Sequence, residues 1–313
     1  MAIDVTALPT PAVIETLDYE AVLASLRADL LRLYPVAAEV IDLESEPLTK
    51  LLQVAAYREL LIRARINDAA RAVMLGWAVG ADLDNLAARY DLARLPGEDD
   101  NRLRQRVLMG YHALSAAGSV TTWRLRALSV SVDIRQVDVW ADRPGRVKVC
   151  LLARVAALAS TTSEEQQRIG RALFGNHPEA NAQDPMCWRV ATPADPIVGK
   201  TEAALMADDV RPLTVDVDVT AARVLPLAVQ ATLVHPPGPD GALLAAAAAS
   251  RVRKLGDRAA FRVDTTRAAV IGAIMGEGIR DVVLTTPTAD MLAGPGEIVA
   301  ITTINIGTQV RHD

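Results

Sequence analysis

The segment with the clearest chemical potential is residues 194–201, which read Ala-Asp-Pro-Ile-Val-Gly-Lys-Thr. This is a relaxed match to a phosphate-binding loop, in which Lys200 and Thr201 would contact phosphates and Mg²⁺. Such a loop needs free backbone amides between a strand and a helix. Pro196 removes one amide, Pro193 lies just upstream, and no Mg²⁺-binding aspartate strand can be placed. We interpret the segment as a loop before a helix opened by Thr201, and keep a nucleotide-binding enzyme as the alternative.

A second candidate is the carboxylate pair Asp216 and Asp218, two positions apart in a strand-like segment. On one side of a strand, the two carboxylates could hold a cation or act as acid and base. Their alternation with Val215, Val217 and Val219 is also what a strand with one solvated face requires. We therefore predict a solvent-facing pair.

The histidines and cysteines do not predict a metal site. The four histidines have no His, Cys or carboxylate neighbour at metal-ligand spacing; they are His112, His177, His235 and His312. Cys150 and Cys187 stand at unrelated positions, which predicts neither a disulfide framework nor a zinc site. Cys150 is interpreted as a small apolar filler in a strand. No catalytic, cofactor-binding or metal-binding residue is predicted, and the chain is not expected to be an enzyme.

Composition excludes further classes. The 313 residues are 51% hydrophobic and 23% charged, which is typical of a folded protein with two or three domains. The net charge of −5, from 33 basic and 38 acidic residues, does not predict a nucleic-acid-binding protein. Because no basic leader and no apolar run of about 20 residues is present, we expect no signal peptide, no membrane contact and synthesis in the cytoplasm.

The N-terminal third predicts helices. Residues 1–17 are expected to form an extended arm, because Pro9 and Pro11 disfavour helix; the arm either lies on a neighbouring subunit or is a frayed terminus. A helix follows from Asp18 to about Tyr34. A longer helix begins near Pro47 and carries an apolar stripe with charges on its far side, a pattern that favours a bundle within the chain or between chains. The predicted interface residues on this stripe are Leu48, Leu51, Ala55, Ile62, Ile66, Val73 and Trp77.

Residues 77–153 contain an ordered series of short elements. Gly80 is expected at positive φ, with Asp82 capping a helix, and Asp99 and Asp100 suit the start of the next one. Its apolar face would be Leu103, Val107, Tyr111 and Leu114. Ser119 would cap a further helix, and a slip in the strand pattern predicts a bulge near Arg135. Pro144-Gly145 fits a type II turn of a hairpin that ends near Leu152.

The order of these signals resembles the baseplate J-like family of contractile phage tails and related injection machines. The matching features are the Gly80/Leu83-Asp84/Leu86-Ala87 turn, the acidic start before Leu103 and Arg106, Ala117-Gly118-Ser119, and the Pro144-Gly145 hairpin. The resemblance implies a structural role in the virion tail baseplate without catalytic residues. Residues 102–106 and 124–126 carry arginines that could form a basic edge, but the adjacent acidic residues 98–100 favour a salt-bridged protein interface over nucleic acid.

The rest of the chain completes an α+β fold. A helix is expected from Thr161 or Thr162 to Leu173, residues 175–199 are Pro-rich and predicted to be irregular, and residues 215–219 and 227–234 are predicted strands. Two helices, over residues 241–255 and 265–275, precede closing strands at 282–284 and 297–306. The predicted domains are the arm at 1–17, an N-terminal helical bundle region at 18–117, and two small α+β sandwich domains at 118–222 (with the irregular insertion 175–199) and 223–313.

The resemblance also implies partners. Two copies of this chain would join in each wedge, and their N-terminal helices would bundle with a second baseplate wedge protein. Six wedges would form a ring near a sheath-initiating subunit of lysozyme-like fold, with assembly in the host cytoplasm. The insertion at 175–199 would be a contact loop. A generic homo-oligomeric scaffold outside tails is a further alternative.

Overall fold

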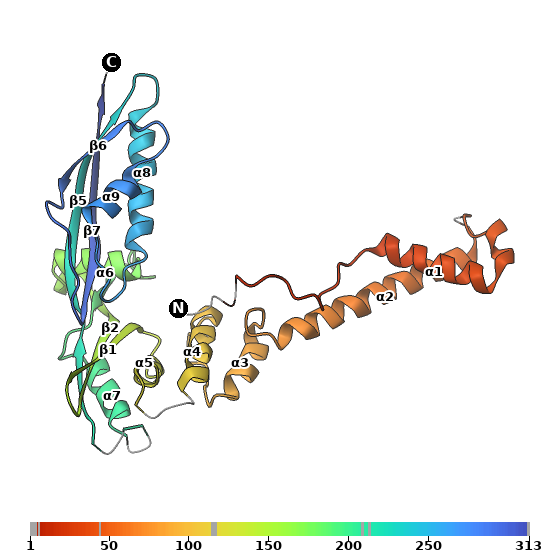
Figure 1. The fold of residues 1–313 in the computed structure, drawn as a ribbon, viewed down its shortest axis with the longest axis horizontal. Coiled ribbons are helices and arrows are strands. Elements are labelled where there is room, and N and C mark those ends of the chain that lie inside the picture. The colour runs from red at the N-terminus through yellow and green to blue at the C-terminus, as the bar shows by residue number, and fades with distance from the viewer. Residues whose placement is uncertain are drawn as a thin grey trace. The chain divides into compact units, whose positions relative to one another are not determined.

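The computed structural model describes residues 5, 7–43, 45–113, 118–207, 210–211 and 214–311 (Figure 1). The fold is α+β, as predicted, with helices first and two sheets after them. The chain forms two compact units, one made of residues 1–94 and 98–108 and the other of residues 95–97 and 109–313. Both predicted sheet domains lie in the second unit; their treatment as separate domains remains our proposal.

The first unit is built on two helices that lie side by side (Figure 1). Helix α1 spans Tyr19–Leu33, and the carboxylate of Asp18 caps it by accepting a hydrogen bond from the amide of Ala21. A 3₁₀ turn, η1 (Pro35–Glu39), leads to α2 (Pro47–Ala72). Buried side chains of both helices form their contact: Val22, Leu23 and Ala56. The second helix ends at Ala72, before the predicted end of its stripe at Trp77, which lies in a turn.

The arm lies along the side of α2 in the same chain. The side-chain amide of Asn67, which is only 3% exposed, accepts a hydrogen bond from the backbone N–H of Glu15 and donates one to its carbonyl. The Glu15 carboxylate also pairs with Arg63 at 2.9 Å. The arm is thus held on its own chain at Glu15, which neither sequence interpretation anticipated.

Helices α3 (Gly80–Ala88) and α4 (Asp100–Ala113) follow. Gly80 has φ +53°, as predicted, but it begins α3 rather than preceding it, so Asp82 lies in the first turn and is not the cap. The cap at α4 is confirmed, because the Asp99 carboxylate accepts a hydrogen bond from the amide of Arg102. A small core includes Leu83, Ala87, Leu103 and Val107. Tyr111 is exposed rather than buried, and Leu114 lies outside the described residues.

The second unit begins with a helix and a hairpin. Helix α5 (Val120–Leu128) is capped by Ser119, as predicted. Strands β1 (Ile134–Arg143) and β2 (Arg146–Leu158) pair antiparallel around Pro144-Gly145, with Gly145 at the φ of +77° that the turn requires. The register shifts between Ile134 and Gln136, which confirms the predicted bulge. The hairpin is longer than predicted, because β2 continues past Leu152.

The sheet around β2 gains one strand from within the predicted insertion and one from after it. After η2 (Ala159–Thr161), α6 (Glu164–Phe174) is capped by Ser163 and not by the predicted threonines. Strand β3 (Met186–Val190) pairs antiparallel with β2, and β4 (Asp216–Ala221) pairs parallel with it. Helix α7 (Pro196–Leu205) lies between them in sequence. Residues 175–199 are therefore irregular only in part, since β3 and the start of α7 lie inside them.

The C-terminal sheet has the order β6-β5-β7. Strand β5 (Arg223–His235) is central, antiparallel to β6 (Asp281–Thr286) and parallel to β7 (Glu297–Val310). Helices α8 (Gly241–Gly256) and α9 (Arg267–Ile274) cover one face and bury side chains against β5 and β7 (Figure 1). Each strand and helix predicted in this region is present, with shifted ends.

The two sheets are joined by continuous backbone. Strand β5 starts two residues after β4 ends. At this point the amide of Ala222 donates to the carbonyl of Leu151 in the first sheet, and the amide of Arg223 donates to the carbonyl of Gly296 beside the second. A shared cluster of buried side chains, including Leu152, Ile169 and Ile298, fills the space between the sheets.

Candidate interaction surfaces

The segment that resembles a phosphate-binding loop has no open cradle. Pro196 begins α7, so Lys200 and Thr201 lie within the helix, and the fully buried Thr201 hydroxyl donates to the carbonyl of Ile197 at 2.8 Å. Thr201 therefore does not open the helix, which starts five residues earlier than predicted. These contacts fix the segment as a packed loop-to-helix junction.

Asp195, at the start of α7, has structural partners. Both of its carboxylate oxygens accept hydrogen bonds from the guanidinium of Arg189, at 2.7 and 2.6 Å, and the amide and hydroxyl of Thr192 also donate to it. The hydrogen bonds from Arg189 hold the pKa of Asp195 well below its usual range. The carboxylate is thus an ionised anchor between β3 and α7.

The other candidate ligands are also occupied. Asp216 and Asp218 lie on one side of β4 and face Arg146 of β2, at 3.4 and 3.2 Å. Burial raises the pKa of the Cys150 thiol to about 11, which makes it a poor nucleophile near neutral pH. In the described part of the chain, no three His, Cys, Asp or Glu side chains form a group that could hold a metal ion, and no helix is long and apolar enough to span a membrane. His312 lies outside the described residues.

Two of the arginines expected at a basic edge are interior instead, whereas Arg126 is exposed. Arg104 and Arg106 are 6% and 2% exposed, because Arg104 donates to the carbonyls of Leu75 and Ala78 while Arg106 pairs with the buried carboxylate of Glu98 at 2.6 Å. The sequence pattern could not show this burial, because a run of alternating arginines is typical of a solvated face. This network holds α4 against the turns before α3.

Nearby, Arg94 links the starts of both helices in the same network. Its guanidinium pairs with Asp84 and with Asp100, each at 2.7 Å, and the Asp100 carboxylate accepts a hydrogen bond from the amide of Gly80. These hydrogen bonds, first of all the one from Gly80, lower the pKa of Asp100. Gly80 and Asp84, which carry part of the family resemblance, therefore make contacts that stabilise the fold.

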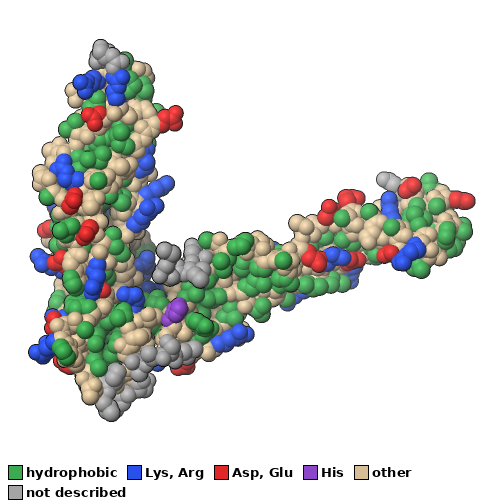
Figure 2. All heavy atoms as spheres, in the orientation of Figure 1, with side chains coloured by type: hydrophobic (Ala, Val, Ile, Leu, Met, Phe, Trp, Pro, Cys, Tyr) green, Lys and Arg blue, Asp and Glu red, His purple; other side chains and the backbone are tan. Residues whose placement is uncertain are grey.

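The apolar stripe of α2 is a surface of a different kind. At 3.6 residues per turn, the stripe residues from Leu48 to Val73 fall within an arc of about 60° on one side of the helix, and Trp77 lies beyond the helix end. Leu51, Ile62, Ile66 and Val73 are 65%, 60%, 57% and 64% exposed, Ala55 is exposed, Leu48 is half-buried and Trp77 is 37% exposed. Figure 2 shows hydrophobic side chains along this helical unit. The buried residues Ala56 and Asn67 contact α1 and the arm on another side, so α1 and the arm leave the stripe from Leu51 to Val73 exposed.

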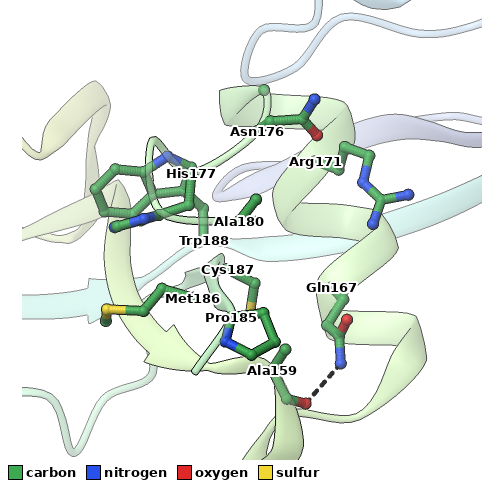
Figure 3. A pocket seen from close by; sticks show the side chains of 11 residues that line it. Ala159, Gln167, Arg171, Asn176, His177, Ala180, Pro185, Met186, Cys187 and Trp188 are labelled. Atoms are coloured by element: carbon green, nitrogen blue, oxygen red, sulfur yellow. Dashed lines mark hydrogen bonds between the residues drawn. The ribbon is translucent and has the colours of Figure 1, made fainter. Parts of the chain in front are cut away.

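The loop before β3 encloses a small pocket of about 160 Å³ (Figure 3). The ring of His177 lies against the ring of Trp188, with centroids 4.4 Å apart, and the guanidinium of Arg154 lies 4.3 Å from the Trp188 ring. On the other wall, the side chain of Gln167 donates to the carbonyl of Ala159 at 2.8 Å. The loop is thus held by packing and hydrogen bonds, and its role as a contact loop remains a proposal.

Comparison with known proteins gives two matches. Residues 44–98 match the family described as the Baseplate J-like N-terminal domain. This range covers all of α2, with its exposed stripe, as well as α3 and the loop that carries Arg94. The chain is also similar to "Baseplate protein J" from Escherichia phage P2, with 32% identity over 312 aligned residues. The alignment covers 93% of this chain and 92% of the phage P2 protein. The second match covers nearly the whole chain.

Proposed function

This chain belongs to the baseplate J-like family of structural phage baseplate proteins, and we propose that within the tail baseplate it is a wedge subunit of a contractile tail or related injection machine. It acts through protein–protein interfaces, without catalysis and without a cofactor. Two copies join in each wedge with a second wedge protein, and six wedges form a ring that contacts a sheath-initiating subunit of lysozyme-like fold. Assembly takes place in the host cytoplasm.

The exposed stripe of α2 is the observation that carries this proposal. Soluble proteins seldom leave a long row of large apolar side chains in water, and such rows usually mark a protein-binding surface. Burying apolar surface stabilises a complex by about 25 cal/mol per Å². Covering the stripe therefore gives a helical partner a clear driving force. The spacing of three and four residues matches the way one helix packs along another. We therefore assign the stripe to the helical bundle of the wedge.

The test is co-expression of the full chain with its genomic neighbours, followed by the absolute mass of the purified complex from light scattering. The expected product contains two copies of this chain and one second wedge protein. Hydrogen exchange should then show protection confined to the stripe side of α2 on complex formation. A chain that stays monomeric in the presence of every neighbour contradicts the wedge role. A complex without protection of α2 contradicts the assignment of the stripe.

A further inference from the structure

A groove outside the α2 stripe has an unusual concentration of positive charge. It lies in the second unit, between α6, the end of α8 and the middle of β7, and its volume is about 360 Å³. Three arginines line it: Arg168 and Arg171 from α6 and Arg253 from α8. A neighbouring hollow of about 350 Å³ shares Arg171 and adds Arg135. Asp257 is the acidic residue that lines both.

The four arginines have no partners within the described chain. Each side chain is exposed, and no ion pair or side-chain hydrogen bond engages its guanidinium. By contrast, the guanidinium groups of Arg104, Arg106 and Arg189 all donate to carboxylates or carbonyls. Like charges gathered in a groove repel one another, so an arrangement of this kind is stabilised when an anionic ligand neutralises it.

The edge of β7 meets the same groove. Ile301, Thr302 and Ile304 contribute to the lining, and β7 is one of the two outer strands of the β6-β5-β7 sheet. From Ile298 to Val310 the strand contains no charged residue and no proline. Edge strands are normally protected by such residues, because their unpaired N–H and C=O groups can pair with another strand. One bulge interrupts the pairing near Thr302, and from there to Val310 neither a charged residue nor a proline protects the strand.

We propose that the groove binds an extended acidic segment of a partner protein, which adds as a strand to the outer edge of β7. The backbone of the segment would pair with the free N–H and C=O groups of residues 303–310. Its acidic side chains would meet Arg168, Arg171 and Arg253, where Arg–carboxylate pairing adds charge-assisted hydrogen bonds. This inference goes beyond the proposed wedge role, because it concerns a surface on other elements than the α2 stripe.

Two other occupants fit less well. A second copy pairing β7 with β7 would bring no acidic side chain to the arginines, since residues 298–310 have none. A nucleic acid offers phosphate oxygens, which accept hydrogen bonds but cannot satisfy the carbonyl groups of a strand edge. An acidic peptide strand supplies both the negative charge and the matching backbone donors and acceptors.

The test uses the full chain and a blocked peptide of alternating glutamate and valine, with a lysine–valine peptide as the charge control. Binding is measured by fluorescence anisotropy at physiological salt, and hydrogen exchange maps the contact. We expect the acidic peptide to bind and to protect the amides of residues 303–310. Arg168→Glu, Arg171→Glu and Arg253→Glu should each weaken binding about tenfold or more. Lys254→Glu, an exposed neighbour that does not line the groove, is the matched control and should leave the affinity within about twofold.

Several results would overturn the proposal. These are equal binding of both peptides, loss of binding in the Lys254→Glu control as well, or binding without protection of residues 303–310. Tighter binding of a DNA oligonucleotide with the same arginine dependence would assign the groove to nucleic acid. A doubled mass by light scattering, lost when Asn305→Pro and Ile306→Pro break the edge in separate variants, would assign it to a second copy. Variants of the α2 stripe should not alter peptide binding, which separates this test from that of the wedge role.

Discussion

The Nε of Arg262 lies 3.0 and 2.8 Å from the two carboxylate oxygens of Asp138, although the two residues are 124 positions apart. The backbone N–H of Gly296 donates to the same carboxylate at 3.0 Å, and the ring of Trp140 lies beneath the Arg262 guanidinium at 5.5 Å. Asp138 is 4% exposed. One buried carboxylate of β1 thus ties the first sheet to the segment that leads into β7.

We predict that Asp138→Ala lowers the free energy of unfolding of the second unit by about 2–4 kcal/mol, because it leaves the Gly296 amide unsatisfied and the Arg262 charge unpaired. Urea unfolding followed by tryptophan fluorescence measures this. Asp142→Ala on the same strand is the control, since Asp142 makes only a half-exposed 3.8 Å pair with Lys148 and should change stability by about 0.5 kcal/mol or less. Equal effects of the two substitutions would contradict the anchoring role of Asp138.

A second prediction concerns Gly296, at the same junction between the two sheets. Its φ is +73°, and a Cβ added there would lie 3.1 Å from the Trp140 ring and 3.2 Å from the Cys150 sulfur. Gly296→Ala should therefore destabilise the fold by about 2–5 kcal/mol, from the backbone conformation together with the crowding. Gly175→Ala, at φ +78° and ψ −167° with no atom within 4 Å, has a backbone term without crowding and should lose about 1–3 kcal/mol. Thermal unfolding of both variants separates the two terms, and a Gly296→Ala loss no larger than that of Gly175→Ala would exclude the crowding.

The Asp195–Arg189 pair predicts a pH dependence. Because the folded pKa of Asp195 is depressed, its contribution is fully present above the unfolded pKa of about 3.9 and is lost as the pH falls toward the folded pKa. Asp195→Asn should therefore be less stable than the unsubstituted chain at pH 6, by about 1–3 kcal/mol, and this difference should shrink at pH 2.5. Urea unfolding at the two pH values provides the measurement. A difference that stays constant or grows on acidification would contradict the predicted ion pair.

Asn67 should control the arm. Asn67→Ala removes both hydrogen bonds to the backbone of Glu15, so the amide of Glu15 should exchange with solvent at least about tenfold faster, since losing a hydrogen bond of about 1.4 kcal/mol shifts an opening equilibrium by that factor. The matched control is Asp68→Ala, whose side chain is 61% exposed and pairs only with Arg71. Unchanged exchange at Glu15 in the Asn67 variant would show that other contacts hold the arm.

The α2 stripe gives the prediction closest to function. Ile62→Glu combined with Ile66→Glu should leave the isolated chain as stable as before, within about 1 kcal/mol, because both side chains are already exposed. The same variant should fail to form the complex with the second wedge protein, because carboxylates would be buried without partners. Lys50→Glu, on an exposed polar position of the same helix, is the control and should assemble normally. Light scattering reports both masses, and assembly of the double variant would contradict the assignment of the stripe.

Local signals in the sequence determined the elements, because capping, turn formation and periodicity depend on neighbours within a few residues. Asp18, Ser119 and the Pro144-Gly145 turn act as predicted, and the bulge near Arg135 follows from a change of phase that needs no tertiary information. The sequence predicted the ends of the elements less accurately. Thr201 looked like a helix start, but Pro196 can occupy the first helical position, and the helix begins there.

The sequence also determined the family and the stripe of α2, since an ordered set of motifs and an apolar period are linear properties. It could not show which side of α2 is covered, because that depends on where α1 and the arm lie. Tertiary structure alone decided that Arg104 and Arg106 are buried, that Asp138 meets Arg262, and that the arginines of α6 and α8 share one groove with β7. The physical reason is common to all three: ion pairs and grooves form between segments distant in sequence, and a charged residue has the same letter whether it is paired inside or free at the surface.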